Sequence, residues 1–131
     1  MLKKSFDEKM SVAMARGTVV LDENLWHLVQ ALKDKNMHVI MPDAKMNDQK
    51  IKHDLLSNRI LITENSKDFV RDASVYDYGI IATEKLSSKD VDNVVQKIQD
   101  ALIDHSLWSK RHGFIVYLKD NGTSDYRELT T

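Results

Sequence analysis

The sequence has no cysteine, one proline and four glycines among its 131 residues. Without cysteine it forms no disulfide, uses no thiol nucleophile and builds no cysteine zinc site, which is compatible with a reducing compartment. So little glycine and proline excludes collagen-like and low-complexity chains. The sequence also lacks the roughly 18 consecutive apolar residues of a membrane span and the apolar run of a signal peptide. We therefore expect a cytoplasmic protein with no membrane segment.

An excess of charge of one sign is missing as well. Nineteen Lys and Arg side chains are balanced by twenty Asp and Glu, for a formal net charge of −1. The global basic field of many nucleic-acid-binding proteins is therefore absent, and any contact with RNA must be local or assisted by a metal ion. What the chain does have is a globular composition, 42% hydrophobic and 30% charged. Its length fits one domain with a core of its own, and we expect a single domain over residues 1–131.

Short apolar segments alternate with segments of helical periodicity, a pattern typical of parallel α/β sheets. The predicted strands are residues 18–22, 37–41, 59–62, 78–83 and 113–118, and the predicted helices are 24–35, 48–58 and 88–105, with a brief helix or turn over 66–73. A leading helix is expected within residues 1–17, and a turn with an edge strand within 119–131. Ser88 is the expected cap of the long helix. The predicted fold class is α/β, an open, mostly parallel sheet of four to six strands with helices on both faces.

Acidic and polar residues follow four of the predicted strands. Ligands of open parallel sheets bind outside the carboxyl ends of the strands, so these residues are candidates for a site. In chain order they are Asp22, Glu23, Asn24, Asp43, Asn47, Asp48, Thr63, Glu64, Asn65, Asp68, Thr83 and Glu84. Converging carboxylates without cysteine suit Mg²⁺ or Mn²⁺. Such clusters often serve phosphodiester hydrolysis, although acids at helix starts also act simply as caps.

Three of these segments resemble the PIN-like nuclease superfamily, in particular its compact bacterial and archaeal branch. Val19-Val-Leu-Asp-Glu-Asn-Leu25 is similar to the opening strand of that branch, which ends in a metal-binding Asp. Asp48-Gln-Lys-Ile51 is similar to its Asp-x-x-Ile helix start, and Ile60-Leu-Ile-Thr-Glu-Asn-Ser-Lys-Asp-Phe69 to the PIN Thr-x-Asn-x-Lys-Asp-Phe turn. The resemblance covers about residues 18 to 118.

The resemblance implies a Mg²⁺- or Mn²⁺-dependent ribonuclease. By it, Asp22, Asp48 and Asp68 are the metal ligands, while Thr63 and Asn65 shape the loop and hydrogen-bond a ligand or water. It further implies RNA as the substrate, the toxin half of a toxin–antitoxin pair with an antitoxin protein as partner, and a homodimer.

Two other functions stay open. The fuller PIN pattern has a further acid before the position of Asp48, where this chain offers only Asp43 or its neighbours, and Asn65 is neutral where many relatives have Asp. A PIN-like domain with a degenerate metal site and a role in protein interaction or regulation is the first alternative. The second is a receiver-like signalling domain, suggested by Asp22-Glu23 and Thr83 but opposed by Thr63, which stands where a phospho-accepting Asp belongs.

Basic residues in two segments are candidates for binding phosphates. They are Lys50, Lys52 and His53 on the helix that begins at Asp48, and residues 110–112, which read Lys-Arg-His. Short basic runs are more often solvated surface, and Trp26 and Trp108, which could stack on bases, more often pack at the border of a core.

Overall fold

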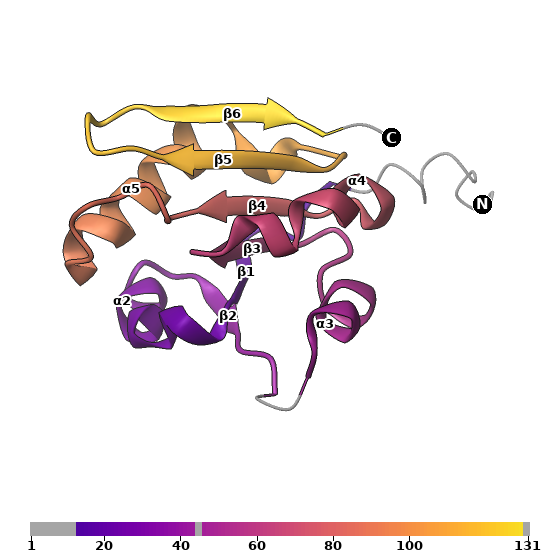
Figure 1. Cartoon of the computed structure of the whole chain (residues 1–131). Coiled ribbons are helices and arrows are strands. Elements are labelled where there is room, and N and C mark those ends of the chain that lie inside the picture. Colours follow the sequence, from indigo (N-terminus) through magenta and orange to yellow (C-terminus); the bar gives the residue numbers. More distant parts are fainter. Residues whose placement is uncertain (1–12, 44–45, 130–131) are drawn as a thin grey trace, which may run out of the picture.

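The computed structural model describes residues 13–43 and 46–129, which form a six-stranded sheet in the order β2-β1-β3-β4-β5-β6 (Figure 1). The first five strands in this order are parallel, and β6 is antiparallel to β5. The strands are β1 (Thr18–Leu21), β2 (His38–Ile40), β3 (Ile60–Thr63), β4 (Gly79–Ala82), β5 (Phe114–Leu118) and β6 (Ser124–Glu128). The predicted open, mostly parallel sheet is confirmed.

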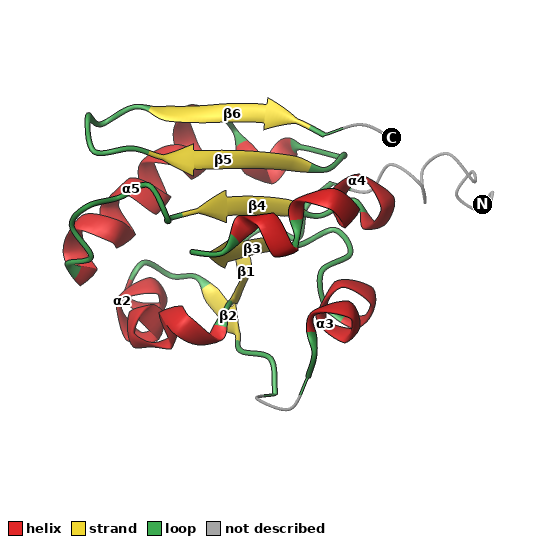
Figure 2. Ribbon diagram, viewed as in Figure 1, coloured by secondary structure: helices red, strands yellow, loops and turns green. Residues whose placement is uncertain are grey.

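Helices cover both faces of the sheet (Figure 2). One face packs against η1 (Glu23–Leu28), α2 (Val29–Asp34), α5 (Val91–Asp104) and η4 (Leu107–Ser109). The other packs against α3 (Asp48–Asp54), η2 (Ser66–Asp68), η3 (Val70–Asp72) and α4 (Ala73–Tyr76). In the part of the chain that the structure describes, none of these helices has the length and apolar character needed to cross a membrane.

The two cores follow from the alternation of side chains along each strand. Leu21, Ile62 and Ile81 belong to the core under α2 and α5, and each is 0% exposed. Residues one position earlier, such as Leu61 and Ile80, belong to the core under α3 and α4. Because both faces of the strands are buried, their sequences read as continuous apolar runs.

The order of the strands defines a switch point between β1 and β3. The chain leaves β1 for β2 on one side and then returns past β1 to form β3 on its other side. Successive connections therefore lie on opposite faces of the sheet. In sheets of this order, the ligand crevice lies outside the carboxyl ends of the two strands that flank the switch point.

Several predicted boundaries differ from those observed. Residues 13–16 are not helical, and the rest of the predicted leading helix lies outside the described residues. The long helix α5 begins at Val91 because the Asp90 carboxylate, rather than Ser88, caps it, accepting from the Asn93 N–H at 3.3 Å. A carboxylate suits this position because it also meets the positive end of the helix dipole.

The helix that begins at Asp48 ends at Asp54, four residues before the predicted end at 58. The chain turns at Asn58, which adopts a positive φ of 57°, a conformation that ends helices and that Asn tolerates better than most residues.

Candidate functional site

Asp22 and Thr63 meet at the switch point. Leu21 pairs with Ile62 in the register of β1 and β3, so the next residue of each strand, Asp22 and Thr63, lie side by side. The buried Thr63 hydroxyl donates to Asp22 Oδ2 at 2.7 Å. The other carboxylate oxygen accepts from the Glu23 N–H at 2.8 Å, which makes Asp22 the cap of η1. The Asp22 carboxylate is therefore held through both of its oxygens.

The loop after β3 extends this network to Asp68. The Thr63 hydroxyl also accepts from the Asn65 backbone N–H at 3.0 Å. The Asn65 side-chain amide donates to Asp68 Oδ2. A continuous chain of hydrogen bonds thus runs from Asp22 through Thr63 and Asn65 to Asp68.

Asp48 approaches the same region from the other side of the switch point. It is the first residue of α3, directly after the capping residue Asn47, whose side chain accepts from the Lys50 N–H at 2.9 Å. Although much of Asp48 is exposed, partial burial raises the pKa of its carboxyl, the negative charges of Asp68 and Asp22 raise that pKa further, and Lys52 opposes them. Asp22, Asp48 and Asp68 therefore share one electrostatic environment.

The donor chemistry of these residues fits Mg²⁺ or Mn²⁺, which prefer hard carboxylate oxygens. Within residues 13–43 and 46–129, however, no group of three or more His, Asp or Glu side chains is arranged to hold a metal ion. Asp22 and Asp68 are instead engaged with Thr63 and Asn65. Because Mg²⁺ keeps several of its waters and often binds through only one or two carboxylates, a closed protein cage is not required.

A small cavity of about 60 Å³ opens beside Asp22 and Asp48. Asp43 and Glu23 also line it, which brings two further acids to this edge. Trp26 forms another part of the wall, where its indole N–H donates to the Leu21 carbonyl at 3.2 Å. This ring packs against the core, as predicted, and also borders the cavity.

Glu84 also lies at this edge, where its place after a predicted strand put it among the candidates with no role of its own. Its carboxylate accepts from the Ser66 N–H at 3.2 Å and from the Ser66 hydroxyl at 2.5 Å. Glu84 follows β4 and Ser66 begins η2, so this contact fixes the loop that carries Asn65 and Asp68. No local pattern signals it, because the partners lie 18 residues apart.

The prediction that Lys52 is available to phosphates is wrong. Lys52 is 5% exposed, and its Nζ lies 3.0 Å from Asp72 Oδ2. Its ammonium group also lies 5.6 Å from the centroid of the Phe69 ring. A buried ammonium without a carboxylate partner would be costly, so Lys52 is committed to this ion pair.

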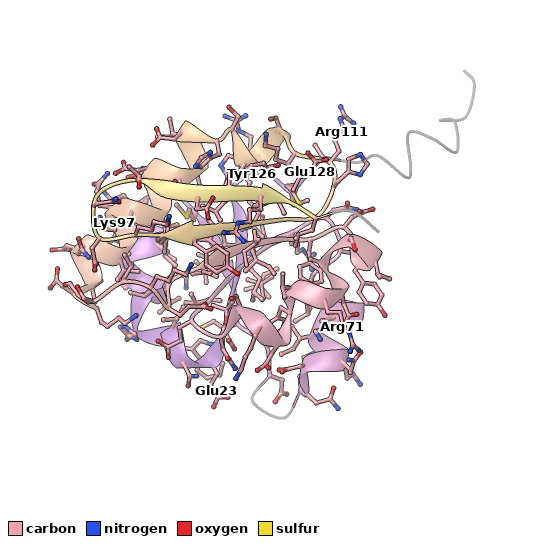
Figure 3. The ribbon with its side chains drawn as sticks, turned by 45° about the horizontal axis from the view of Figure 1, so that its top comes forward. Glu23, Arg71, Lys97, Arg111, Tyr126 and Glu128 are labelled. Carbon is pink, nitrogen blue, oxygen red and sulfur yellow. The ribbon has the colours of Figure 1, made fainter. Side chains whose placement is uncertain are left out.

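The remaining basic candidates do not join the site. Residues 110–112 precede β5 and line a cavity of about 270 Å³ together with Tyr126 and Glu128, at the opposite edge of the sheet from Asp22. Figure 3 shows Arg111 and Glu128 near each other and far from Glu23. Lys50 is exposed on α3, and the side chain of His53 lies outside those described.

No protein-family model, curated protein or solved structure matched the chain when we compared it with each of these sets. The function must therefore be argued from the site. A receiver function finds no support there, because β3 ends in Thr63, whose buried hydroxyl is bonded to Asp22.

Proposed function

We propose that this protein is a PIN-like, Mg²⁺- or Mn²⁺-dependent ribonuclease whose metal ligands are Asp22, Asp48 and Asp68. The observation that supports it most is the convergence of the three acids: Asp22 and Asp48 line one cavity, and Asp68 is linked to Asp22 by hydrogen bonds through Thr63 and Asn65. Burial first, and then the charges of Asp68 and Asp22, raise the pKa of Asp48 there. Carboxylates that repel one another at a switch point create a position where a divalent cation is favourable. A purely structural cap has no need of such crowding.

Each polar residue has a distinct task in this proposal. Thr63 fixes the orientation of the Asp22 carboxylate, and Asn65 fixes that of Asp68. When bound, the metal ion supplies an activated water and neutralises charge on the phosphodiester. Glu84 acts at a distance by holding Ser66, so it is a positioning residue.

The shape of this edge favours a polymeric substrate. The cavity beside Asp22 holds about 60 Å³, well below the roughly 300 Å³ and more of pockets that enclose small molecules. A strand of RNA can instead lie across the edge and present one phosphodiester to the acids. Because the edge is acidic, phosphate binding there depends on the bound cation, and we expect affinity for RNA to rise with Mn²⁺.

The first test is a calorimetric titration of Mn²⁺ into the wild type and Asp22→Asn. We expect binding by the wild type and at least about tenfold weaker binding by the variant, because a carboxylate ligand is lost. Asp34→Asn is the matched control, since Asp34 is exposed on α2 and an amide oxygen can still accept from Gln30. Equal binding by all three proteins would place the metal elsewhere.

Cleavage of RNA is the second test. Purified wild type with Mn²⁺ should cut unstructured RNA, and Asp22→Asn and Asp48→Asn should not. If the protein is the toxin half of a toxin–antitoxin pair in the cytoplasm, its expression should arrest growth, and co-expression of the antitoxin should relieve the arrest. Growth arrest by Asp22→Asn equal to that by the wild type would contradict this role.

A specific observation favours a second candidate, a PIN-like domain that has lost catalysis and binds another protein. The described residues contain no ready-made group of three metal ligands. In that case neither the wild type nor Asp22→Asn binds Mn²⁺, RNA stays intact, and the protein binds a partner with or without Asp22.

A further inference from the structure

The outer strand of the sheet, β6, presents one row of backbone groups away from the molecule. In Figure 1, β6 is the topmost strand, with no described strand beyond it. The Leu129 N–H donates to the Gly113 carbonyl at 2.8 Å, so in the register of β5 and β6 the residues that bond inward are 125, 127 and 129. By the alternation of an antiparallel ladder, the N–H and C=O groups of Ser124, Tyr126 and Glu128 point outward.

The side chains of β6 are complementary to a second copy of themselves. The strand reads Ser124-Asp-Tyr-Arg-Glu128. Antiparallel pairing of two copies about Tyr126 places Asp125 of each copy opposite Arg127 of the other. Asp125 and Arg127 are on the same face of the strand. In the dimer, each of these four side chains therefore has oppositely charged neighbours, one on its own strand and one on the other copy.

The backbone agrees with this register. In the pairing centred on Tyr126, the outward backbone N–H and C=O groups of Tyr126 face those of the other Tyr126. Those of Ser124 face those of Glu128 in the other copy. Each of these residue pairs exchanges two hydrogen bonds. Asp125 and Arg127 then form the intervening non-hydrogen-bonded pairs, in which side chains approach most closely.

Neighbouring registers are unfavourable. A shift of two residues in one direction sets Asp125 against Asp125 of the other copy, and a shift in the opposite direction sets Arg127 against Arg127. Like charges directly opposite each other destabilise a sheet. Shifts of one residue set outward groups against inward ones. The charges therefore select a single register.

The strand is also held ready for pairing. The Ser124 hydroxyl lies 2.7 Å from His105 Nε2, and the Tyr126 ring stacks on His105 with centroids 5.5 Å apart. Arg127 Nη2 lies 2.9 Å from Asp125 Oδ2, and the guanidinium lies 5.6 Å from the centroid of the Tyr117 ring. Because these contacts already restrict the side chains of β6, few side chains lose freedom when two copies bind, and the entropic cost of binding is lower.

We infer that two copies of this chain associate through β6 and form one continuous twelve-stranded sheet, since each copy contributes six strands. A charged edge strand is commonly a device against such pairing. Here, however, the charges attract in the one register that the backbone favours.

The test is sedimentation velocity of the full chain over a range of concentrations, with Asp125→Arg and Arg127→Asp measured beside the wild type. The wild type should shift from the mass of one chain, 15.1 kDa, toward twice that mass as its concentration rises. Each single variant sets like charges against each other, so its dimer should dissociate at a concentration about tenfold higher or more.

Two matched controls use the same residues. The double variant Asp125→Arg with Arg127→Asp exchanges the charges and should dimerise like the wild type. An equal mixture of the two single variants should also dimerise, because the two positive charges of Asp125→Arg then face the two negative charges of Arg127→Asp. Thermal unfolding of each variant checks that it is folded.

A wild type that stays monomeric at every concentration would overturn the inference. Dimerisation of the single variants at wild-type strength would do so as well, because it would assign the interface to another surface. Neither result bears on Mn²⁺ binding at Asp22, so this inference and the proposed function fail independently.

Discussion

The carboxyl ends of β3 and β4 share a sequence and differ in structure. The same dipeptide stands at both ends: Thr63 is the last residue of β3 and precedes Glu64, and Thr83-Glu84 directly follows β4. The Thr63 hydroxyl uses both its donor and its acceptor capacity, to Asp22 and from Asn65. Thr83 is 1% exposed, and its buried hydroxyl has no hydrogen-bond partner among the described residues.

The neighbouring strand explains the difference. β3 lies beside β1, which delivers the Asp22 carboxylate to Thr63, whereas β4 lies between β3 and β5. In the register Thr63 faces Ala82, so Thr83 lies one residue further on, and its N–H donates to the Thr63 carbonyl at 2.9 Å. The same local sequence becomes part of a site in one place and an unsatisfied polar group in the other.

The largest effect is expected where the two strands begin. Ile60 of β3 faces Gly79 of β4, and a Cβ at Gly79 would lie 2.1 Å from the Phe114 ring. Gly79→Ala should therefore lower the free energy of unfolding by about 3 kcal/mol, measured by urea denaturation. Gly79→Ala combined with Phe114→Leu should recover part of this loss. An unchanged midpoint would show that the ring moves aside freely.

Removal of the Thr63 hydroxyl should cost less. Thr63→Val leaves the Asn65 N–H and Asp22 without their shared partner, and we expect a loss of about 2 kcal/mol. Thr63→Ser keeps the hydroxyl and is the control. If Mn²⁺ binds as proposed, Thr63→Val should also weaken it, while Thr63→Ser should weaken it less. Equal stability of the two variants would mean that the bond to Asp22 contributes nothing.

The same change at Thr83 should have the opposite sign. Thr83→Val removes a buried hydroxyl that makes no hydrogen bond and replaces it with a methyl group of similar size. The free energy of unfolding should rise by about 1 kcal/mol. A loss of stability comparable with that of Thr63→Val would reveal a partner for Thr83 and remove the contrast between the two strands.

The smallest effect concerns pH. Because the pKa of Asp48 is raised above 3.8 in the folded protein, the folded state binds this proton more tightly than the unfolded state. Its ionisation therefore opposes folding, and stability from this group falls as pH rises from 3.8 through the raised pKa. Asp68→Asn removes one cause and should lower the pKa of Asp48, measured by NMR titration of its carboxyl carbon. Asp34→Asn should leave that pKa unchanged.

Much of the fold could be predicted because it depends on local periodicity. The five parallel strands and the main helices come from apolar runs and helical spacing, and their ends move by a few residues where a cap or a positive φ decides. Asp90, and not Ser88, caps α5. Both residues carry a side-chain oxygen that can cap a helix, and the sequence alone does not decide between them.

The candidate site was predictable only as a set of residues at one sheet edge. That Asp22 meets Thr63 depends on β3 pairing with β1, which is a matter of strand order. The burial of Lys52 against Asp72 and the contact of Glu84 with Ser66 join elements far apart in the chain. Such pairs result from tertiary packing, and the spacing of residues along the sequence does not predict them.

The Thr63–Asp22 hydrogen bond can form only after β3 has docked beside β1, so it reports on one step of folding. Its partners lie forty-one residues apart, and β1, although it is the first of the described strands, has a neighbouring strand on each side. The segment that contains β2 and α3 forms the loop that must close when β3 docks beside β1, and the closing of such a long-range parallel pairing is slow. A probe of this bond would register the moment when the centre of the sheet closes.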